Sequence, residues 1–91
     1  MPKYLVERRL PGLTEQQLKA AAMRAKVSTS QMTQEGTPVR YLRSMYIPGE
    51  EKCFCLFEAA SADVVKQANE RAQLPMQHIF EAVHVSSEDL D

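Results

Sequence analysis

Five side chains with metal-binding or acid–base chemistry stand out in stretches that predict β-strands: Glu7, Cys53, Cys55, His78 and His84. Carboxylate, thiolate and neutral imidazole are the protein groups that bind transition metals. A carboxylate or an imidazole in a cavity can also act as a general acid or base. The residue types therefore indicate either a metal site or acid–base chemistry.

Glu7 lies in the stretch from Lys3 to Arg9, where side chains alternate between two faces as they do in a strand. A carboxylate among apolar neighbours in a central strand needs a partner, because burying an unpaired charge is costly. One interpretation makes Glu7 a metal ligand or a general base. The other pairs it with an arginine from a neighbouring element or subunit, and both stay open at this point.

Cys53 and Cys55 share one face of their predicted strand, about 6–7 Å apart. A disulfide between residues so placed has poor geometry, so they are expected to be ligands of a soft metal or small buried apolar residues. His78 and His84 also share a face, but about 20 Å separates them along an extended strand. One ion cannot take both from one chain, and His78 is the histidine expected to bind.

Other polar residues in the strands have structural interpretations beside functional ones. Glu58 closes a predicted strand and is expected to accept hydrogen bonds from loop amides. Ser44 and Tyr46 share a strand face and either supply hydroxyls to a cavity or pack. The three glycines form no phosphate-binding loop, and no Ser–His–Asp arrangement with a nucleophile elbow is present.

Composition and charge narrow the class of protein. The 91 residues suit one domain, and 44% hydrophobic with 25% charged residues is ordinary for a globular chain. No signal-like or membrane-length apolar run is seen, and two cysteines imply no disulfide framework, so a reducing cytoplasm is expected.

Residues 1–45 carry a charge of +5 and residues 46–91 a charge of −6. Because the basic residues are scattered, we expect the halves to attract each other and expect no nucleic-acid or membrane partner.

Periodicity predicts the order strand, helix, strand, strand, helix, strand. Thr14 with Gln17 forms a capping box at the start of the first helix, which should fade near residues 28–30. Ser61 caps the second helix, which ends at Leu74-Pro75. The four strands are expected over residues 3–9, 38–47, 52–58 and 77–85. Residues 1–85 then form the domain, and residues 86–91 an acidic, disordered tail.

This order is that of a ferredoxin-like α+β sandwich, βαββαβ. Right-handed crossovers give an antiparallel four-stranded sheet of order 4-1-3-2, with two helices on one face. The strands carry apolar residues on both faces, such as Leu5 beside Tyr4 and Val6. A sheet with one solvated face would alternate cleanly, so a second subunit is expected to cover the open face in a homodimer.

Short motifs then show a resemblance to a known family: Tyr4-Leu5-Val6-Glu7-Arg8, Leu42-Arg43-Ser44, Cys55-Leu56-Phe57-Glu58-Ala59, and Leu74-Pro75 near Ile79-Phe80-Glu81. Their order and spacing over residues 3–83 resemble a bacterial family of domains of unknown function, one member of which is described as a nickel-binding protein. This family is similar to dimeric α+β barrels, in which two ferredoxin-like sheets face each other. It usually has a glycine where this chain has Gln73.

The resemblance implies nickel as the metal, in or near a dimeric barrel. The ligands are then expected from Glu7, Cys55 and His78, from one subunit or both, a mixed set that nickel accepts. The alternative is a cofactor-independent enzyme of the monooxygenase or isomerase type, with a small-molecule cavity of a few hundred Å³ and Glu7 or His78 as its acid–base group. A non-catalytic interaction scaffold is the third hypothesis.

Overall fold

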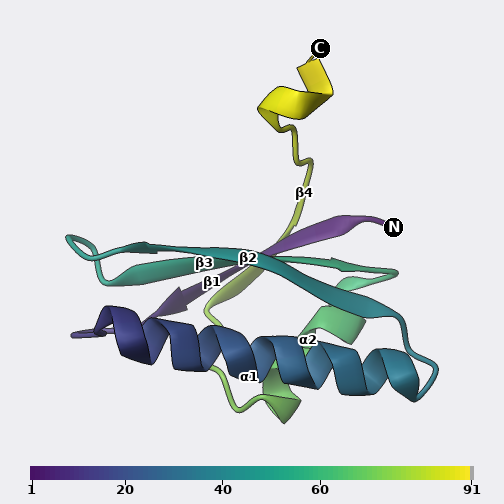
Figure 1. Ribbon diagram of the computed structural model, residues 1–91, viewed down its shortest axis with the longest axis horizontal. Helices are drawn as coiled ribbons and strands as arrows, with labels where there is room; N and C mark the ends of the chain where they lie inside the picture. Colours follow the sequence, from purple (N-terminus) through teal and green to yellow (C-terminus); the bar gives the residue numbers. More distant parts are fainter. Residues whose placement is uncertain (91) are drawn as a thin grey trace.

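The computed structural model describes residues 1–90 as two helices packed on a four-stranded sheet (Figure 1), with the predicted order of elements. A short 3₁₀ helix, η1, follows the last strand. The bounds are β1 Lys3–Arg9, α1 Glu15–Gln34, β2 Val39–Ile47, β3 Lys52–Ala59, α2 Ala62–Arg71, β4 His78–Ala82 and η1 Ser87–Leu90.

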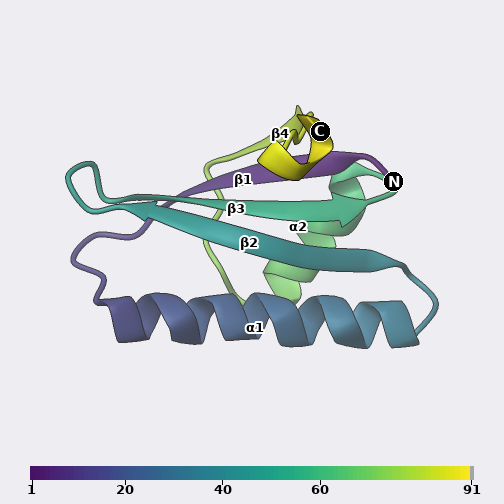
Figure 2. The ribbon, with the colours of Figure 1, turned by 45° about the horizontal axis from the view of Figure 1, so that its top comes forward.

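The sheet has the order β2-β3-β1-β4, and every neighbouring pair is antiparallel. This is the predicted order read from the other edge, and both helices cover the same face (Figure 2). The ferredoxin-like α+β fold is therefore confirmed. β1 is a central strand, so the two sides of its side-chain alternation decide what lies under the helices and what lies on the open face.

The core lies between the sheet and the helices. Val6 and Phe57, from the two central strands, are fully buried there, as is Val65 from α2. Small residues such as Ala25 and Ala68 let the helices approach the sheet closely. Burying each large apolar side chain contributes about 1.5–3 kcal/mol, and this burial fixes the register of the strands. Neither helix within residues 1–90 is long and apolar enough to cross a membrane.

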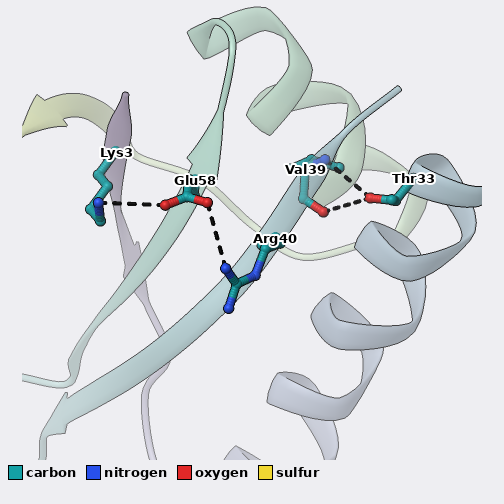
Figure 3. Close-up of polar contacts among 5 residues, drawn as sticks. All are labelled: Lys3, Thr33, Val39, Arg40 and Glu58. Carbon is teal, nitrogen blue, oxygen red and sulfur yellow. Dashed lines mark hydrogen bonds and ion pairs between the residues drawn. The ribbon is translucent and has the colours of Figure 1, made fainter. Parts of the chain in front are cut away.

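α1 is longer than predicted and ends at Gln34 instead of near residues 28–30. The hydroxyl residues that suggested an earlier end do not break the helix, because the Thr29 hydroxyl donates to the Lys26 carbonyl within α1 and others bond to neighbouring elements. The Ser28 hydroxyl donates to the Ala68 carbonyl of α2 at 2.7 Å. The Thr33 hydroxyl donates to the Val39 carbonyl and accepts from its N–H, which ties α1 to the start of β2 (Figure 3). The predicted capping box at Thr14 is present.

β4 is shorter than predicted because its partner is short. Ala82 pairs with Lys3, the first residue of β1, so no strand remains for later residues to pair with. The chain then leaves the sheet on the side away from the helices (Figure 1). None of the residues of η1 is buried. The predicted disorder of residues 86–91 stays a prediction, and Asp91 lies outside the described residues.

The end of α2 places a non-glycine residue in the left-handed backbone region. Gln73 has φ 57°. Its N–H donates to the Glu70 carbonyl, and the Leu74 N–H donates to the Asn69 carbonyl, both at 3.0 Å. These two bonds form a Schellman motif, whose left-handed position is usually glycine. Gln73 therefore holds a conformation that its Cβ disfavours.

We expect Gln73→Gly to stabilise the protein by about 0.5–1 kcal/mol, since relief of left-handed strain exceeds the entropy that glycine adds to the unfolded chain. Urea unfolding followed by circular dichroism measures the change. The matched control is Gln67→Gly in the exposed middle of α2, which should cost about 1 kcal/mol. Equal destabilisation by both variants would contradict the strain at Gln73.

Candidate functional site

The predicted site residues lie on opposite faces of the sheet. Glu7 pairs with His78 on β4 and Phe54 on β3, on the open face. Val6 pairs with Cys55, which is buried under the helices. The three predicted metal ligands Glu7, Cys55 and His78 therefore do not gather around one point within this chain.

Glu7 and His78 form a close pair on the open face. The His78 Nδ1 lies 3.5 Å from Glu7 Oε1, and Lys52 Nζ lies 3.9 Å from Glu7 Oε2. The Glu7 side chain is 19% exposed, whereas that of His78 is 62% exposed. The His78 ring stacks on Phe80, with ring centroids 5.6 Å apart. The carboxylate thus has an imidazole and an ammonium group as its partners, where the sequence suggested an arginine.

The donor chemistry of this pair fits a transition-metal ion, but the pair is incomplete. An imidazole nitrogen and a carboxylate oxygen this close can both bind one ion. Over residues 1–90, however, no three His, Cys, Asp or Glu side chains gather as a ligand set. Two donors leave most coordination positions open, so further ligands must come from solvent or from another chain.

A mainly apolar cavity of about 310 Å³ lies elsewhere on the open face. Leu5 and Leu56 lie on its wall, and Arg43 and His84 supply its basic groups. Its size matches the cavity expected of a small-molecule enzyme. Glu7 and His78, the predicted acid–base residues, are not among the side chains that line it.

Glu58 serves the sheet rather than a loop. Its carboxylate lies 3.4 Å from Lys3 Nζ and 3.7 Å from Arg40 Nη1, so it links β1, β3 and β2 across the open face (Figure 3). The predicted structural role is in keeping with this arrangement, but the partners are cations instead of loop amides. Tyr46 also has a structural partner, since its hydroxyl donates to the Leu10 carbonyl at 2.7 Å.

The two cysteines form a polar cluster beneath the helices. Their Sγ atoms are 3.7 Å apart, and both thiols are free. The Ser44 hydroxyl donates to Cys55 Sγ at 2.9 Å, and the Tyr41 hydroxyl lies 2.7 Å from Ser44 Oγ. A chain of hydrogen-bonding groups therefore runs from β2 to the sulfur of Cys55.

Arg8 is the functional residue that the sequence did not single out. It is 1% exposed and lies opposite Cys53 on β1. Its Nη1 donates to the Pro75 carbonyl at 3.1 Å, but its buried Nη2 has no hydrogen-bond partner among residues 1–90. The alternation of side chains along residues 3–9 already puts Arg8 on the same face as the apolar residues Tyr4 and Val6.

This environment separates the pKa values of the two thiols. The hydrogen bond from the Cys53 S–H, the charge of Arg8 and the Ser44 hydroxyl together lower the pKa of Cys55 to about 6, against the opposing effect of burial. The pKa of Cys53 is raised, because its proton is held in the bond to Cys55 and because it is buried. The cluster therefore favours one thiolate, on Cys55, and one thiol, on Cys53.

Comparison with known proteins places the chain in a family. A family model described as "Nickel responsive protein SCO4226-like" matches residues 4–82. The chain belongs to the SCO4226-like family. The solved structure titled as the crystal structure analysis of SCO4226 from Streptomyces coelicolor A3(2) superposes with a TM-score of 0.79 and 22% identity, over 92% of this chain and 99% of that one. None of the curated proteins matches significantly.

The match to SCO4226 shows a shared fold, and at this identity it assigns no role to individual residues. The family description connects this fold with a response to nickel. Within this member of the SCO4226-like family, two clusters on opposite sheet faces have the chemistry for a function: the Glu7–His78 pair and the Cys53–Cys55 cluster.

We expect Cys53→Ala to raise the pKa of Cys55 toward the usual thiol value of about 8.5, because the variant removes the strongest hydrogen bond to the thiolate. The absorbance of the thiolate at about 240 nm, measured between about pH 5 and 9, reports the titration. Cys55→Ala is the control. In this variant the rise in thiolate absorbance near the pKa of Cys55, the low-pH step, should be absent. A low-pH step that survives in Cys55→Ala would contradict the assignment.

Proposed function

We propose that this protein binds nickel as a homodimer, with Glu7 and His78 of each subunit as ligands. The observation that carries the proposal is the 3.5 Å separation of the His78 and Glu7 side chains on the uncovered sheet face. Imidazole and carboxylate are ligands that nickel accepts. The description of the family as nickel responsive supports nickel over other divalent metals.

A second copy of the chain would complete the donor set. A two-fold axis near the pair would bring a second Glu7 and His78 to the same ion, giving four protein ligands where one chain offers two. The proposal therefore joins metal binding to dimerisation. One nickel ion per two chains is the stoichiometry that it requires.

Lys52 is expected to oppose the metal. Its ammonium group lies 3.9 Å from Glu7 Oε2 and partly neutralises the carboxylate. A divalent cation at the pair must displace this group or tolerate its charge. Removal of the Lys52 charge should therefore strengthen nickel binding.

Cys55 has no place in this metal site. The sheet separates its thiol from the open face, and the guanidinium of Arg8 lies beside the cysteine pair. A positive charge in a buried environment disfavours a second cation there. The expected sulfur ligand is therefore left out of the proposed nickel site.

The open face has the character of a subunit interface. Phe80 of β4 and Met45 of β2 are large apolar residues that stay exposed there, and Val83 in the segment after β4 is 93% exposed. This segment rises from the sheet on the side away from the helices (Figure 2). Large apolar side chains exposed on a sheet face that no helix covers are typical of a surface that a partner covers, and a second copy of this chain is the partner that we propose.

A small-molecule enzyme is the second candidate, favoured by the cavity of about 310 Å³ on the same face. Its acid–base group would then be His84, with Arg43 binding an anionic part of the substrate, instead of Glu7 or His78. A dimer that ignores nickel but binds a small anion in this cavity would favour this candidate.

We expect His78→Ala to abolish nickel binding, because it removes the imidazole nitrogen. Glu7→Gln should weaken binding about tenfold or more, because a neutral amide oxygen replaces the carboxylate. Lys52→Met should tighten binding. Titration calorimetry gives the affinities, and native mass spectrometry gives the stoichiometry. His84→Ala is the matched control and should bind like the unaltered protein. Unchanged nickel uptake by both Glu7→Gln and His78→Ala would contradict the proposed ligands.

We expect Val83→Asp to convert the dimer to a monomer, because a charge then has to be buried in the interface. The change should leave the fold of one chain intact, since Val83 is almost fully exposed within it. Light scattering coupled to size-exclusion chromatography measures the mass. Met23→Asp, on the exposed outer side of α1, is the control and should stay dimeric. A monomeric unaltered protein would overturn the dimer itself.

A further inference from the structure

A buried arginine without a carboxylate is the unexplained feature of the core. No Asp or Glu of the described part of the chain forms an ion pair with Arg8, although its side chain is almost completely buried. Burying an isolated charge is costly, so a buried guanidinium requires a counter-charge. Its unpartnered Nη2 shows that the hydrogen bond to Pro75 does not meet this need.

Cys55 is the group that can supply the counter-charge. The ionisable side chains around it are Cys53, Arg8 and Tyr41. Cys53 holds the shared proton, and burial raises the pKa of Tyr41, so both stay neutral at physiological pH. The Cys55 thiolate and the Arg8 guanidinium then form a buried ion pair, with the Ser44 hydroxyl as a second donor to the sulfur.

A small cavity adjoins this pair. Its volume is about 10 Å³, and Arg8, Ser44, Cys53 and Cys55 all contribute to its wall. Such a space holds about one water-sized molecule. Leu18, which is half-buried, forms part of the same wall. Bulky reagents are excluded, whereas a small neutral molecule can reach the sulfur.

We propose that Cys55 is a peroxide-reactive thiolate, activated by Arg8 and Ser44, and that hydrogen peroxide is the class of oxidant that this site takes. The buried ion pair supplies the nucleophile. The free Nη2 of Arg8 supplies a donor for the negative charge that develops on the leaving oxygen. This inference does not depend on nickel binding, because the cluster lies on the other face of the sheet.

The reaction balances with peroxide as the only oxidant. The Cys55 sulfur attacks one peroxide oxygen, an S–O bond forms and the O–O bond breaks. The sulfur loses two electrons and becomes a sulfenic acid, while the other oxygen leaves as hydroxide and takes a proton to give water. The proton comes from solvent or from the Cys53 thiol.

Cys53 is poorly placed to convert the product to a disulfide. The two residues are neighbours on one strand face, with Cα atoms about 6.5–7 Å apart, at or beyond the upper end of the range that disulfides span. Their Sγ atoms, 3.7 Å apart, would have to approach to bonding distance within a rigid central strand. The sulfenic acid is therefore the expected product, and a disulfide formed from it would equally require initial attack by Cys55.

The test treats the purified, reduced protein with hydrogen peroxide, removes the excess peroxide with catalase, and then unfolds the protein in dimedone, a trap for sulfenic acids that the folded site excludes. Peptide mass spectrometry then locates the adduct. We expect the trapped sulfenic acid to form at Cys55 at least about tenfold faster than at Cys53. The rate should fall as the pH drops below the pKa of Cys55. The bulky reagent dithiobis(nitrobenzoate) should react slowly with the same folded protein.

Two variants test whether Arg8 and Ser44 activate the Cys55 thiol toward peroxide. Arg8→Met removes the counter-charge, and Ser44→Ala removes the hydroxyl with little effect on packing; both should slow peroxide labelling of Cys55. Circular dichroism checks that each variant folds, and Cys53→Ser should still be labelled at Cys55. Labelling of Cys55 no faster than in the urea-unfolded chain, or labelling that Ser44→Ala leaves unchanged, would overturn the proposal.

Discussion

The side-chain alternation of β1 is the constraint on which both functional clusters depend. Because β1 lies between β3 and β4, successive residues point to opposite faces of the sheet. Val6 enters the core under the helices, so Glu7 must face the open side and Arg8 must face the core. A shift of one residue in register would exchange these environments and bury Glu7 beneath the helices. The burial of Val6 and Phe57 in the core therefore fixes the chemistry on both faces.

Charged side chains are balanced by different partners on the two faces of the sheet. On the open face, carboxylates are balanced by cations from neighbouring strands, as Glu58 is by Lys3 and Arg40. These pairs are partly exposed and contribute modestly to stability. Under the helices, Arg8 has no carboxylate partner among residues 1–90, and the thiolate that we propose at Cys55 supplies the opposite charge. The open face thus suits exchange of a metal cation, whereas the buried cluster suits chemistry on the sulfur.

Local sequence patterns predicted the fold because local interactions determine most of it. The Thr14 cap and the strand alternation are encoded within a few residues of where they act. The length of α1 was mispredicted because the partners of Ser28 and Thr33 come from α2 and β2. Likewise, the contact between Glu7 and His78 depends on the register of β1 with β4, which no local pattern specifies. The alternation of β1 puts Arg8 on the core face, but its position beside two thiols is visible only in the packed structure.

The coordination sphere of bound nickel tests the central claim most directly, because the sheet separates the nitrogen and oxygen donors from the sulfur donors. X-ray absorption at the nickel edge distinguishes these ligand types. We predict a first shell of nitrogen and oxygen only, with the multiple scattering of histidine imidazole, that loses its imidazole signal in His78→Ala. A nickel–sulfur shell would instead place the metal at Cys55 and contradict the assignment of separate functions to the two faces.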